Sequence, residues 1–513
     1  MLASVLSSSL VGIDAFAVEV EIDISHGLPG LRTVGLAEGA VREATERVRS
    51  AIKNTGYEFP NRKITVNLAP ADTRKDGSAF DLPIALGILA ATGHLRQERL
   101  RDHLVLGELA LDGRVKPIKG ALPTALLARE KKFSGVLLPR ENADEAAVVG
   151  DHTAIRGVSS LTEAFEFLEG LKEIPQAACT LKDLFEANSQ YEVDFSEVRG
   201  QEQAKRALEV AAAGGHNVLM IGPPGSGKTM LAKRLPTILP AMTFQESVET
   251  TKVHSVMGLM NGQALIATRP FRAPHHTISD AGLIGGGPMP RPGEVSLAHH
   301  GVLFLDELPE FRKNVLEVLR QPLEDGRITI ARVMGTLTFP ANVMLIAAMN
   351  PCPCGFFGDA QHECSCAPLM IQRYRSRISG PLLDRLDIHI EVPAVKYKEL
   401  TEPRRAGNSV LIRERVNRAR ELQLNRFRSM SIFCNAQMGA RELHSFCQVE
   451  SAGERLLELA INRLGLSARA YTRILKVART IADLDDSEQI KAHHVSEAIQ
   501  YRSLDRPTSS SYH

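Results

Sequence analysis

The stretch Gly222–Thr229, with the sequence GPPGSGKT, constrains this chain more than any other. It follows the apolar run Val218–Ile221 and precedes the amphipathic run Met230–Leu235, which is the order of strand, loop and helix that a phosphate-binding P-loop requires. The glycines let backbone N–H groups converge on phosphate oxygens, and the helix N-terminus adds the positive end of a dipole. In the expected nucleotide site, Lys228 reaches the β and γ phosphates and Thr229 ligates Mg²⁺. The full expected set is Gly222, Pro223, Pro224, Gly225, Ser226, Gly227, Lys228 and Thr229.

Two later apolar runs end in polar side chains. Val302–Leu305 ends in Asp306 and Glu307, and Val343–Ala348 is soon followed by Asn350. Beside a P-loop, an acidic pair at a strand end is expected to hold Mg²⁺ through Asp306 and to polarise the attacking water through Glu307. Asn350 is then placed to orient that water. The alternative for Asn350 is a simple turn residue at the end of a strand.

Length, composition and charge limit the class of protein. A chain of 513 residues is expected to hold about three domains, and 44% hydrophobic with 24% charged residues is typical of a soluble globular protein. The net charge of +1 gives no global basic field, so nucleic-acid binding would need a local patch. Seven cysteines in a chain of this length do not indicate a secreted disulfide framework. The start of the chain does not fit a signal peptide, and apolar runs long enough to span a membrane are missing. We therefore expect a cytoplasmic protein without a membrane segment.

Residues 1–170 precede the nucleotide site and are expected to form a separate α/β domain. Phe16–Ile24 alternates apolar and polar residues, as a half-buried strand does. Glu38–Asn54 instead spaces its apolar residues by three and four, which predicts a helix. Lys63–Leu68 predicts another strand, and Pro83–Gly93 a short helix.

Two segments of this domain resemble the proteolytic domain of Lon and the related C-terminal domain of RadA, which share a ribosomal-protein-S5-like fold. They are Lys75–Leu82, KDGSAFDL, and Gly107–Ile118, GELALDGRVKPI. In Lon the equivalent loops carry a serine nucleophile that a neutral lysine activates. Ser78 lies one place from where that serine falls, and Leu122–Leu126 has no lysine at the expected position. The resemblance therefore implies a non-proteolytic relative that acts as a scaffold or binds a partner.

Residues 171–195 lack sustained periodicity and are expected to be a linker, and residues 196–400 are expected to be the ATPase core. A turn at Gly200 and a helix to about Ala213 are similar to the adenine-side entry of AAA+ ATPases. This similarity implies that Val198 and Gly200 line the base.

The stretch Met242–His300, between the P-loop helix and the acidic strand, is long and rich in Gly, Pro and His. Insertions of this size usually carry function or are mobile. The pairs His275-His276 and His299-His300 raise the question of a metal site. Because adjacent residues of a strand point apart, we do not expect one there.

After the acidic strand, the sequence predicts further small elements. Asn314–Arg320 predicts a short helix that Pro322 ends, and Arg327–Phe339 predicts a hairpin. Within Gln372–Asp387, Arg385 is an arginine flanked by acidic and apolar residues. In an oligomeric ATPase an arginine here would reach the γ-phosphate bound to the neighbouring subunit and stabilise charge in the transition state. A surface ion pair with a neighbouring aspartate is the alternative.

Four cysteines cluster shortly after Asn350, namely Cys352, Cys354, Cys364 and Cys366. Four thiolates in two pairs would close a tetrahedral, structural Zn²⁺ site that ties down a loop, and four protein ligands would leave no open position for catalysis. The C-x-C spacing is tighter than the commoner C-x-x-C. Free reduced thiols and a redox switch are therefore kept as alternatives.

Residues 401–506 are helical and basic in pattern and are expected to form a helical lid, with a frayed tail at 507–513. The arginines at its start fit either a solvated helix face or a functional basic surface. Ser467 is a predicted N-cap, and Arg469 and Arg473 lie one turn apart on the helix that it opens. We expect that face to look onto ATP, with Arg469 as the contact in cis and Arg473 as its alternative.

The segments GPPGSGKT, GVLFLDELPEF, AAMNPCPCG and GPLLDRLDIHIEVP follow a Lon-like domain and precede a helical lid. In this order they resemble the bacterial YifB/ComM family of magnesium-chelatase-like AAA+ ATPases over nearly the whole chain. The resemblance implies a multidomain α/β protein that uses ATP and Mg²⁺ and assembles as a homo-oligomer, a hexameric ring in described members. It also implies branched or single-stranded DNA as substrate, with branch-migration helicase activity in natural transformation. The central pore of the ring would be lined by Met242–His300 and by the Arg327–Phe339 hairpin.

Two other functions stay open at this point. A chelatase-like remodeller of a protein or metal-insertion partner would hydrolyse ATP without regard to DNA. An ATP-dependent protease would need a lysine that activates Ser78.

Overall fold

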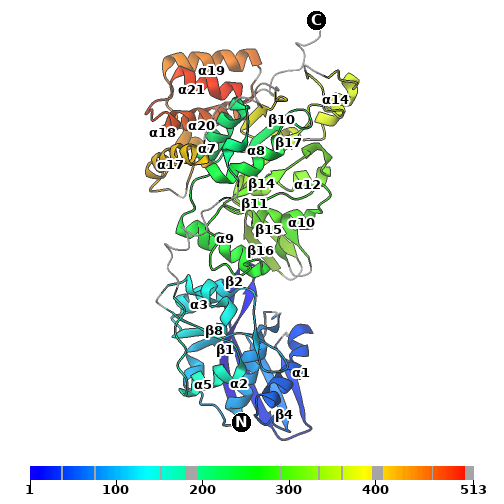
Figure 1. The fold of residues 1–513 in the computed structure, drawn as a ribbon, viewed down its shortest axis with the longest axis vertical. Helices are drawn as coiled ribbons and strands as arrows, with labels where there is room; N and C mark the ends of the chain where they lie inside the picture. The colour runs from blue at the N-terminus through cyan, green and yellow to red at the C-terminus, as the bar shows by residue number, and fades with distance from the viewer. Residues whose placement is uncertain are drawn as a thin grey trace. The chain divides into compact units, whose positions relative to one another are not determined.

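A computed structural model describes residues 1–35, 39–73, 75, 77–150, 153–178, 191, 193–287, 290–332, 335–359, 362–395, 408–430, 432–464 and 466–502. The chain forms two compact units, one made of Met1–Ser189 with Phe244–Ala267 and the other of Gln190–Thr243 with Thr268–His513. Both units mix helices and strands, which confirms the α/β multidomain class (Figure 1). Among the described helices, none is long and apolar enough to cross a membrane. The expected tail at 507–513 and most of the expected linker lie outside the described residues.

The first unit begins with a four-stranded sheet in the order β1 (Leu2–Val11), β2 (Asp14–Ser25), β4 (Lys63–Ala69) and β3 (Gly30–Val34). β1, β2 and β4 pair antiparallel, and β3 joins β4 in parallel. In β2 every second residue points into the core, as its sequence pattern predicted; these residues are Val18, Val20, Ile22 and Ile24.

A second, parallel sheet of the first unit has the order β5 (His103–Val105), β8 (Gly135–Pro139) and β9 (Ala154–Val158). The hairpin β6–β7 (Glu108–Leu109 and Val115–Lys116) lies apart from it. The helices of this part are α1 (Gly39–Asn54), α2 (Asp81–Ala91), α3 (Ala121–Lys131), α4 (Ala143–Ala147) and α5 (Leu161–Glu169). The helices predicted at Glu38–Asn54 and Pro83–Gly93 are therefore α1 and α2, within two residues at each end.

Helix α9 (Phe244–Met257) corrects the expectation that Met242–His300 is one insertion of the ATPase core. It packs on α3, where the backbone N–H of Gly120 donates to the carbonyl of Ser255 at 3.2 Å. The Ser255 hydroxyl also hydrogen-bonds the buried Glu145 carboxylate. The chain thus leaves the second unit for one helix and a short return before it re-enters at Thr268.

The second unit is built on five described strands that all run parallel, in the order β11 (Phe271–Arg272), β14 (Val302–Leu305), β17 (Met344–Met349), β10 (Val218–Ile221) and β18 (Ile388–Glu391). Every residue of β10, β14 and β17 is buried, as expected for strands that helices cover on both faces. Helices α7 (Glu202–Gly214) and α8 (Lys228–Arg234) come directly before and after β10 in the chain (Figure 1). The P-loop connects β10 to α8.

Smaller elements surround this sheet. They are η4 (Phe195–Glu197), α10 (Asp280–Ile284), the pair β12–β13 (Gly285–Gly286 and Arg291–Pro292), α11 (Glu294–Leu297), η6 (Leu308–Glu310), α14 (Pro368–Arg375) and α15 (Gly380–Leu383). The predicted hairpin is β15 (Arg327–Arg332) paired antiparallel with β16 (Gly335–Pro340). The prediction that Pro322 ends a helix is wrong. Helix α12 (Lys313–Glu317) ends earlier, and Pro322 lies in the first turn of α13 (Arg320–Asp325), where a missing N–H breaks no helical hydrogen bond.

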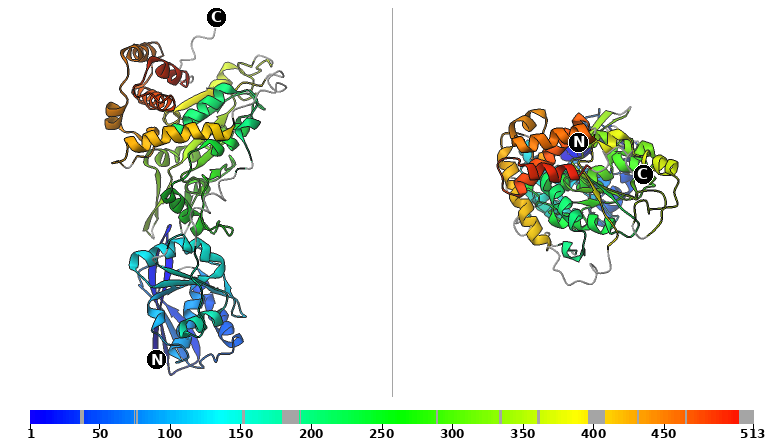
Figure 2. Two further views of the ribbon diagram at one scale, coloured as in Figure 1. Left: turned by 60° about the vertical axis from the view of Figure 1, so that its left-hand side comes forward. Right: turned by 90° about the horizontal axis from the view of Figure 1, so that it is seen from above.

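The C-terminal part of the second unit is helical, with α17 (Ser409–Arg426), η7 (Asn435–Gln437), α18 (Ala440–Phe446), α19 (Ser451–Leu464), α20 (Ala468–Leu484) and α21 (Ala492–Gln500). One continuous apolar core joins these helices to the ATPase sheet. Helix α17, gold in Figure 2, packs against α7 and α20. Its arginines bind inside the unit: Arg415 donates to Glu209 at 2.5 Å and Arg420 to the Ala212 carbonyl at 3.2 Å. These two arginines therefore hold α17 against α7.

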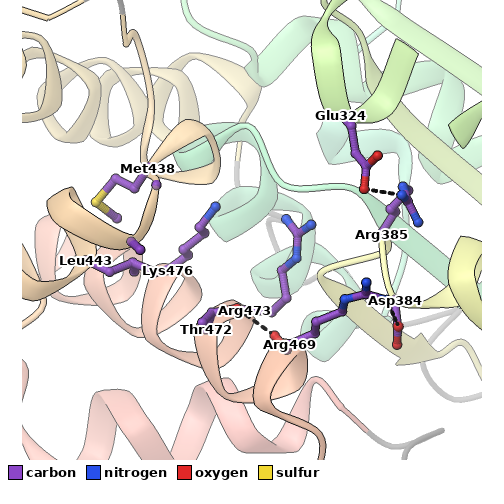
Figure 3. A pocket seen from close by; sticks show the side chains of 11 residues that line it. Glu324, Asp384, Arg385, Met438, Leu443, Arg469, Thr472, Arg473 and Lys476 are labelled. Carbon is purple, nitrogen blue, oxygen red and sulfur yellow. Dashed lines mark hydrogen bonds and ion pairs between the residues drawn. The ribbon is translucent and has the colours of Figure 1, made fainter. Parts of the chain in front are cut away.

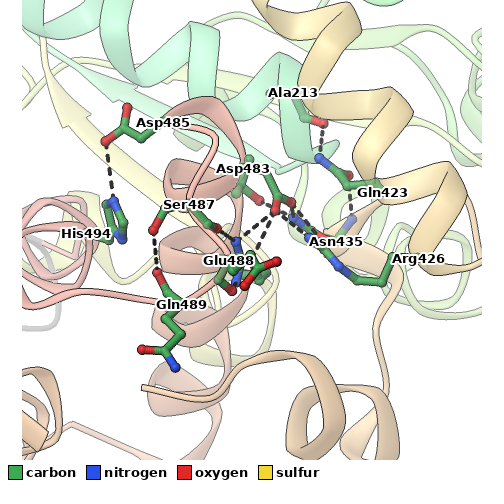
Figure 4. A network of polar contacts seen from close by, with 12 residues as sticks. Ala213, Gln423, Arg426, Asn435, Asp483, Asp485, Ser487, Glu488, Gln489 and His494 are labelled. Atoms are coloured by element: carbon green, nitrogen blue, oxygen red, sulfur yellow. Dashed lines mark hydrogen bonds and ion pairs between the residues drawn. The ribbon is translucent and has the colours of Figure 1, made fainter. Parts of the chain in front are cut away.

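A polar network pins the lid helices together around the buried carboxylate of Asp483 (Figure 4). It accepts hydrogen bonds from Arg426 at 2.5 and 2.9 Å, from Asn435 at 2.7 Å and from Arg479 at 3.0 Å. Gln423 donates to the Ala213 carbonyl at 3.1 Å and so links this network to α7. The lid is therefore fixed to the ATPase core by polar as well as apolar contacts.

Asp387 holds a second buried junction between lid and core. Its carboxylate lies 2.8 Å from the guanidinium of Arg473 on α20 and accepts from the backbone N–H of Asn217 at 3.1 Å. Burial alone would raise the pKa of Asp387, but the Arg473 guanidinium and the His216 ring, whose Nδ1 lies 3.5 Å from the carboxylate, hold it below its ordinary value. The charge of Asp387 therefore stabilises the folded state at neutral pH, and this contribution is lost as the pH falls below the ordinary carboxyl pKa.

Replacing Asp387 with alanine is expected to lower the free energy of unfolding by about 3–5 kcal/mol, because it leaves the Arg473 charge without its partner. Urea denaturation measures this change. Asp384→Ala is the matched control: its ion pair with Arg469 is exposed on the arginine side, and about 0–1 kcal/mol is expected. Equal effects from the two substitutions would contradict the role given to Asp387.

Candidate nucleotide-binding site

The P-loop lies between β10 and α8, where the sequence predicted it. Gly225 and Gly227 have φ of +76° and +92°, a conformation that glycine adopts without strain. The ammonium of Lys228 donates to the carbonyls of Gly222 at 2.7 Å and Pro223 at 2.9 Å. Burial lowers the pKa of Lys228, and the negative charges of Asp306 and Glu307 partly offset this effect. The loop therefore surrounds one cation with backbone groups at the start of a helix.

Sheet order brings the predicted polar residues to this loop. β17 lies between β10 and β14, so the residues that follow these three strands meet at one edge of the sheet. The Thr229 hydroxyl donates to the Asp306 carboxylate at 2.6 Å. A hydroxyl and a carboxylate in contact beside a phosphate loop are the oxygen ligands that Mg²⁺ takes in P-loop proteins, so these residues fit that ion.

Asn350 follows β17, the strand between β10 and β14, and its Oδ1 accepts from the Lys228 ammonium at 3.3 Å. The backbone N–H of Gly222 donates to the carbonyl of Met349 at 3.2 Å, so the strand end and the P-loop are joined directly. The structure thus brings together three of the predicted groups, the lysine, the amide and the Thr229–Asp306 pair.

Glu307 has an unusual backbone, with φ of +52°. Such a conformation costs free energy in a residue other than glycine and tends to occur at functional positions. Its side chain is 58% exposed, and one carboxylate oxygen lies 3.5 Å from Nδ1 of His276. This contact between His276 and Glu307 could not be predicted from local sequence patterns, because the two residues come from distant segments.

The histidine pairs do not point apart as expected. The ring centroids of His275 and His276 are 4.1 Å apart, and those of His299 and His300 are 3.8 Å apart. Neither pair lies in a strand, so the alternation of a strand does not apply to them.

On the side where the base was expected, Gly200 has φ of +63° and marks the turn before α7. The side chain of Val198 is fully buried in the core. Gln201, which the sequence did not single out, donates to the carbonyl of Pro393 at 2.5 Å and to that of Ser226 at 3.3 Å. It therefore ties the P-loop to the chain that leaves β18.

Arg385 lies in a pocket of about 220 Å³ between the ATPase core and the lid (Figure 3). Its guanidinium pairs with Glu324 and donates to the Pro381 carbonyl at 2.5 Å. Its Nε is buried and has no hydrogen-bond partner among the described residues. The charged side chains of the described pocket lining are Glu324, Asp384, Arg385, Arg469, Arg473 and Lys476, with cations in excess.

This pocket lies away from the P-loop of the same chain. Arg385 comes just before β18, whose Ile388 is paired with Val218 at the start of β10, whereas the P-loop follows Ile221 at the end of β10. A strand of that length spans about 13 Å. Arg469 shares the pocket with Arg385, so the structure does not fit the contact in cis that we expected for Arg469.

The four clustered cysteines come together. Sulfur atoms of Cys352 and Cys354 lie 3.3 Å apart, and Cys364 lies 3.7 Å from the first and 3.6 Å from the second. The Cys354 backbone N–H donates to the sulfur of Cys366 at 3.4 Å, and all four sulfurs lie within 4.8 Å of one another. A hydrogen bond with the Phe356 backbone helps to hold the pKa of the Cys354 thiol at about 6. His362 pairs with Asp359 instead of joining the cluster.

In the Lon-like region the hydroxyl of Ser78 hydrogen-bonds the carboxylate of Glu108. The ammonium of Lys75 binds the Pro70 carbonyl. Thr124, in the segment where a lysine was expected and not found, is buried and shares a hydrogen bond of 2.8 Å with Ser8. In this arrangement Ser78 has a carboxylate beside it, where a serine nucleophile needs a neutral lysine.

We therefore expect that a fluorophosphonate probe for active serines will not label this protein. The reason is that the carboxylate beside Ser78 is too weak a base to take the hydroxyl proton, so the serine is not activated as a nucleophile. Mass spectrometry of the treated protein measures the modification, and a Lon protease treated alongside is the positive control. Labelling at Ser78 that Ser78→Ala removes would contradict this expectation.

Comparison with known families shows which class of protein has this sequence. Three family models match in succession: subunit ChlI of Mg-chelatase over residues 20–142, magnesium chelatase subunit ChlI over residues 194–400, and the ChlI C-terminal region over residues 406–502. The fold and the P-loop site thus define a magnesium-chelatase-like AAA+ protein.

Full-length relatives narrow the class. The chain is 44% identical over 507 residues to competence protein ComM of Haemophilus influenzae, with 98% of each chain covered. It is 43% identical over 506 residues to the protein YifB of Escherichia coli, again with 98% of each covered. A shorter match, 30% identical over 142 residues and 26% of each chain, is to Lon protease 2 of Bacillus subtilis. The chain therefore belongs to the ComM/YifB family of magnesium-chelatase-like AAA+ proteins.

Proposed function

We propose that this protein hydrolyses ATP with Mg²⁺ and uses the energy to drive a ring-shaped motor. The observation that carries the proposal is the meeting of Lys228, the Thr229–Asp306 pair, Glu307 and Asn350 at one edge of a parallel sheet. Each of these groups has a distinct task in phosphoryl transfer.

The tasks follow from charge and position. Lys228 binds the β and γ phosphates, and Thr229 with Asp306 holds Mg²⁺, which neutralises charge on those phosphates when bound. Glu307 is exposed at the end of its strand, where its carboxylate can take a proton from the attacking water. Asn350, which contacts Lys228 from the end of β17, orients that water.

The placement of the arginines supports a ring. Arg385 and Arg469 share a cationic pocket at the opposite end of the sheet from their own P-loop. In a closed ring of identical subunits, one end of each subunit faces the other end of its neighbour. We infer that both arginines act in trans on the γ-phosphate of the next subunit, with six subunits as the expected number.

The proposed substrate is branched or single-stranded DNA. Two features support it: one full-length relative is named a competence protein, and the β15–β16 hairpin exposes Arg327 and Arg332. Exposed arginines on a hairpin suit contacts to phosphates that do not depend on base sequence. A chelatase-like remodeller of a protein or metal-insertion partner is the competing function.

The test compares ATP hydrolysis by the purified protein with and without single-stranded, duplex and four-way-junction DNA, across a range of salt concentrations. A DNA motor is stimulated by DNA, and the stimulation falls as salt rises because phosphate contacts release counterions. Basal hydrolysis that ignores every DNA would instead favour the remodeller. A protein with no hydrolysis under any of these conditions would contradict the proposal as a whole.

We also propose that Cys352, Cys354, Cys364 and Cys366 bind one structural Zn²⁺. A tetrahedral site with Zn–S bonds of about 2.3 Å separates its sulfurs by about 3.8 Å. The sulfur distances of 3.3, 3.6 and 3.7 Å lie close to that value, so the residues fit the ion. Metal analysis of the purified protein tests this assignment.

A further inference from the structure

We propose that the four-cysteine site positions the ATP site, so that metal bound there controls the rate of hydrolysis. This inference rests on the proposed ATPase activity and deepens it. Its basis is the path of the chain, which joins the cysteines to the P-loop and to Asn350 at three separate points.

The first connection is covalent. β17 ends at Met349, and Asn350 and Pro351 alone separate it from Cys352. The orientation of the Asn350 amide beside Lys228 is therefore set within two residues of a proposed metal ligand. Any movement of Cys352 turns the backbone that carries this amide.

The second connection runs through α14, which begins two residues after Cys366. From this helix, Arg375 donates to the carbonyl of Pro351 at 3.2 Å. The second cysteine pair thus leads into a helix that holds Pro351, the residue directly before the first pair. A metal bound by both cysteine pairs would therefore hold together the two ends of the loop between them.

The third connection is a direct contact with the P-loop. Gly355, which lies between the cysteine pairs with φ of +90°, is so close to Pro224 that a Cβ on it would come within 2.5 Å of the proline ring. Pro224 is the third residue of GPPGSGKT. The cysteine loop therefore packs against the outer side of the phosphate loop.

The loop itself has little else to fix it. The described residues between the cysteine pairs form turns without a helix or strand. Four thiol groups a few ångström apart attract one another weakly, and as thiolates they repel. A bound cation attracts all four thiolates and so overcomes their repulsion. It also restricts the motion of the loop, which holds Gly355 and Asn350 in one conformation.

With four cysteine ligands the metal has no open coordination position for a substrate. It affects hydrolysis by fixing the positions of Asn350 and the P-loop. A displacement of about 1 Å in groups that orient reactants can cost about 10²-fold in rate. We therefore expect loss of the metal to lower kcat strongly. ATP affinity should change little, because Lys228 and the glycines of the P-loop remain.

The test uses the full-length chain and three readouts: zinc content by mass spectrometry, hydrogen–deuterium exchange of the peptides covering residues 218–229 and 344–351, and ATP hydrolysis. The double variant Cys364→Ser, Cys366→Ser should lose the zinc, exchange faster in both peptides and lose about 10²-fold in kcat. Cys447→Ser, at a buried cysteine outside the cluster, should change none of the three.

A matched glycine pair tests the contact without touching the metal ligands. Gly355→Ala should keep the zinc and lower kcat, because the new methyl group displaces Pro224. Gly358 has a similar φ of +79° but open space around its Cβ position, so Gly358→Ala carries the same backbone strain and should keep the wild-type kcat.

The outcomes separate the two proposals. A wild-type protein without zinc, or a zinc-free double variant with unchanged exchange in both peptides, would overturn the positioning role. Normal kcat in the zinc-free variant would do the same. Hydrolysis absent from the zinc-loaded wild type would overturn the ATPase proposal alone, because the exchange measurement does not depend on activity.

Discussion

Replacing Glu307 with glutamine is expected to lower kcat for ATP hydrolysis about 10²–10⁴-fold, because glutamine cannot take a proton from the attacking water. Binding of ATP should be retained, since in the proposed mechanism Lys228 and the Thr229–Asp306 pair hold the phosphates and the metal. Steady-state hydrolysis measures the first effect, and titration with a fluorescent ATP analogue measures the second.

Glu310→Gln is the control for this substitution. It removes the same charge one 3₁₀ turn further on, where the carboxylate binds Arg377 at 3.0 Å. Its kcat should stay within a few-fold of the wild type, as for most surface changes. A Glu307→Gln protein that turns over ATP normally would remove Glu307 from the role of base.

Replacing Arg385 with alanine is expected to lower hydrolysis about 10³–10⁵-fold, the range that an arginine in this role supplies in GTPases. Lysine at this position should not restore the rate, because a point charge does not reproduce the planar fork of a guanidinium. ATP binding should persist, since the pocket of Arg385 is remote from the P-loop of its own chain. Hydrolysis and analogue binding by the variant measure both effects.

The control for this substitution is Glu324→Gln, which removes the ion-pair partner of Arg385 and leaves the arginine in place. If the arginine acts only by holding the pocket together, Glu324→Gln and Arg385→Ala should be equally damaging. If it acts on a phosphate, Glu324→Gln should retain most of the hydrolysis.

The core of the candidate site could be predicted from the sequence because its pattern is local. GPPGSGKT, the acidic pair after Val302–Leu305 and the asparagine after the third apolar run each follow a buried strand. The carboxyl ends of parallel strands share one edge of a sheet, so these residues had to meet once the strands paired in parallel. Local residue patterns also predicted the hairpin at Arg327–Phe339, which is β15 and β16.

Contacts between distant segments could not be predicted in this way. No sequence pattern in Phe244–Ala267 predicts that it belongs to the first unit. The contact of His276 with Glu307 and the tie from Gln201 to the P-loop also depend on tertiary packing. No periodicity or motif marks these residues in advance.

Arg469 shows why a helical pattern alone does not fix a role. Its spacing from Arg473 was enough to place both on one face of α20, and the Ser467 cap is present, with its hydroxyl accepting from the backbone N–H of Ala470 at 3.2 Å. Which way that face points depends on how the lid packs on the sheet. The buried pair of Arg473 with Asp387 turns the face toward Arg385, and this pair is invisible in the local sequence.

The most direct test of the shared active site is the hydrolysis rate of a mixture of two inactive proteins. On the proposed mechanism, Lys228→Ala loses its contacts to the phosphates, and Arg385→Ala has no arginine to supply to a neighbour. In a mixed ring, a subunit with an intact P-loop can sit beside one with an intact Arg385, so the mixture should recover a clear part of the wild-type rate. A mixture no more active than the sum of its parts, under conditions where the subunits exchange, would contradict an active site built between subunits.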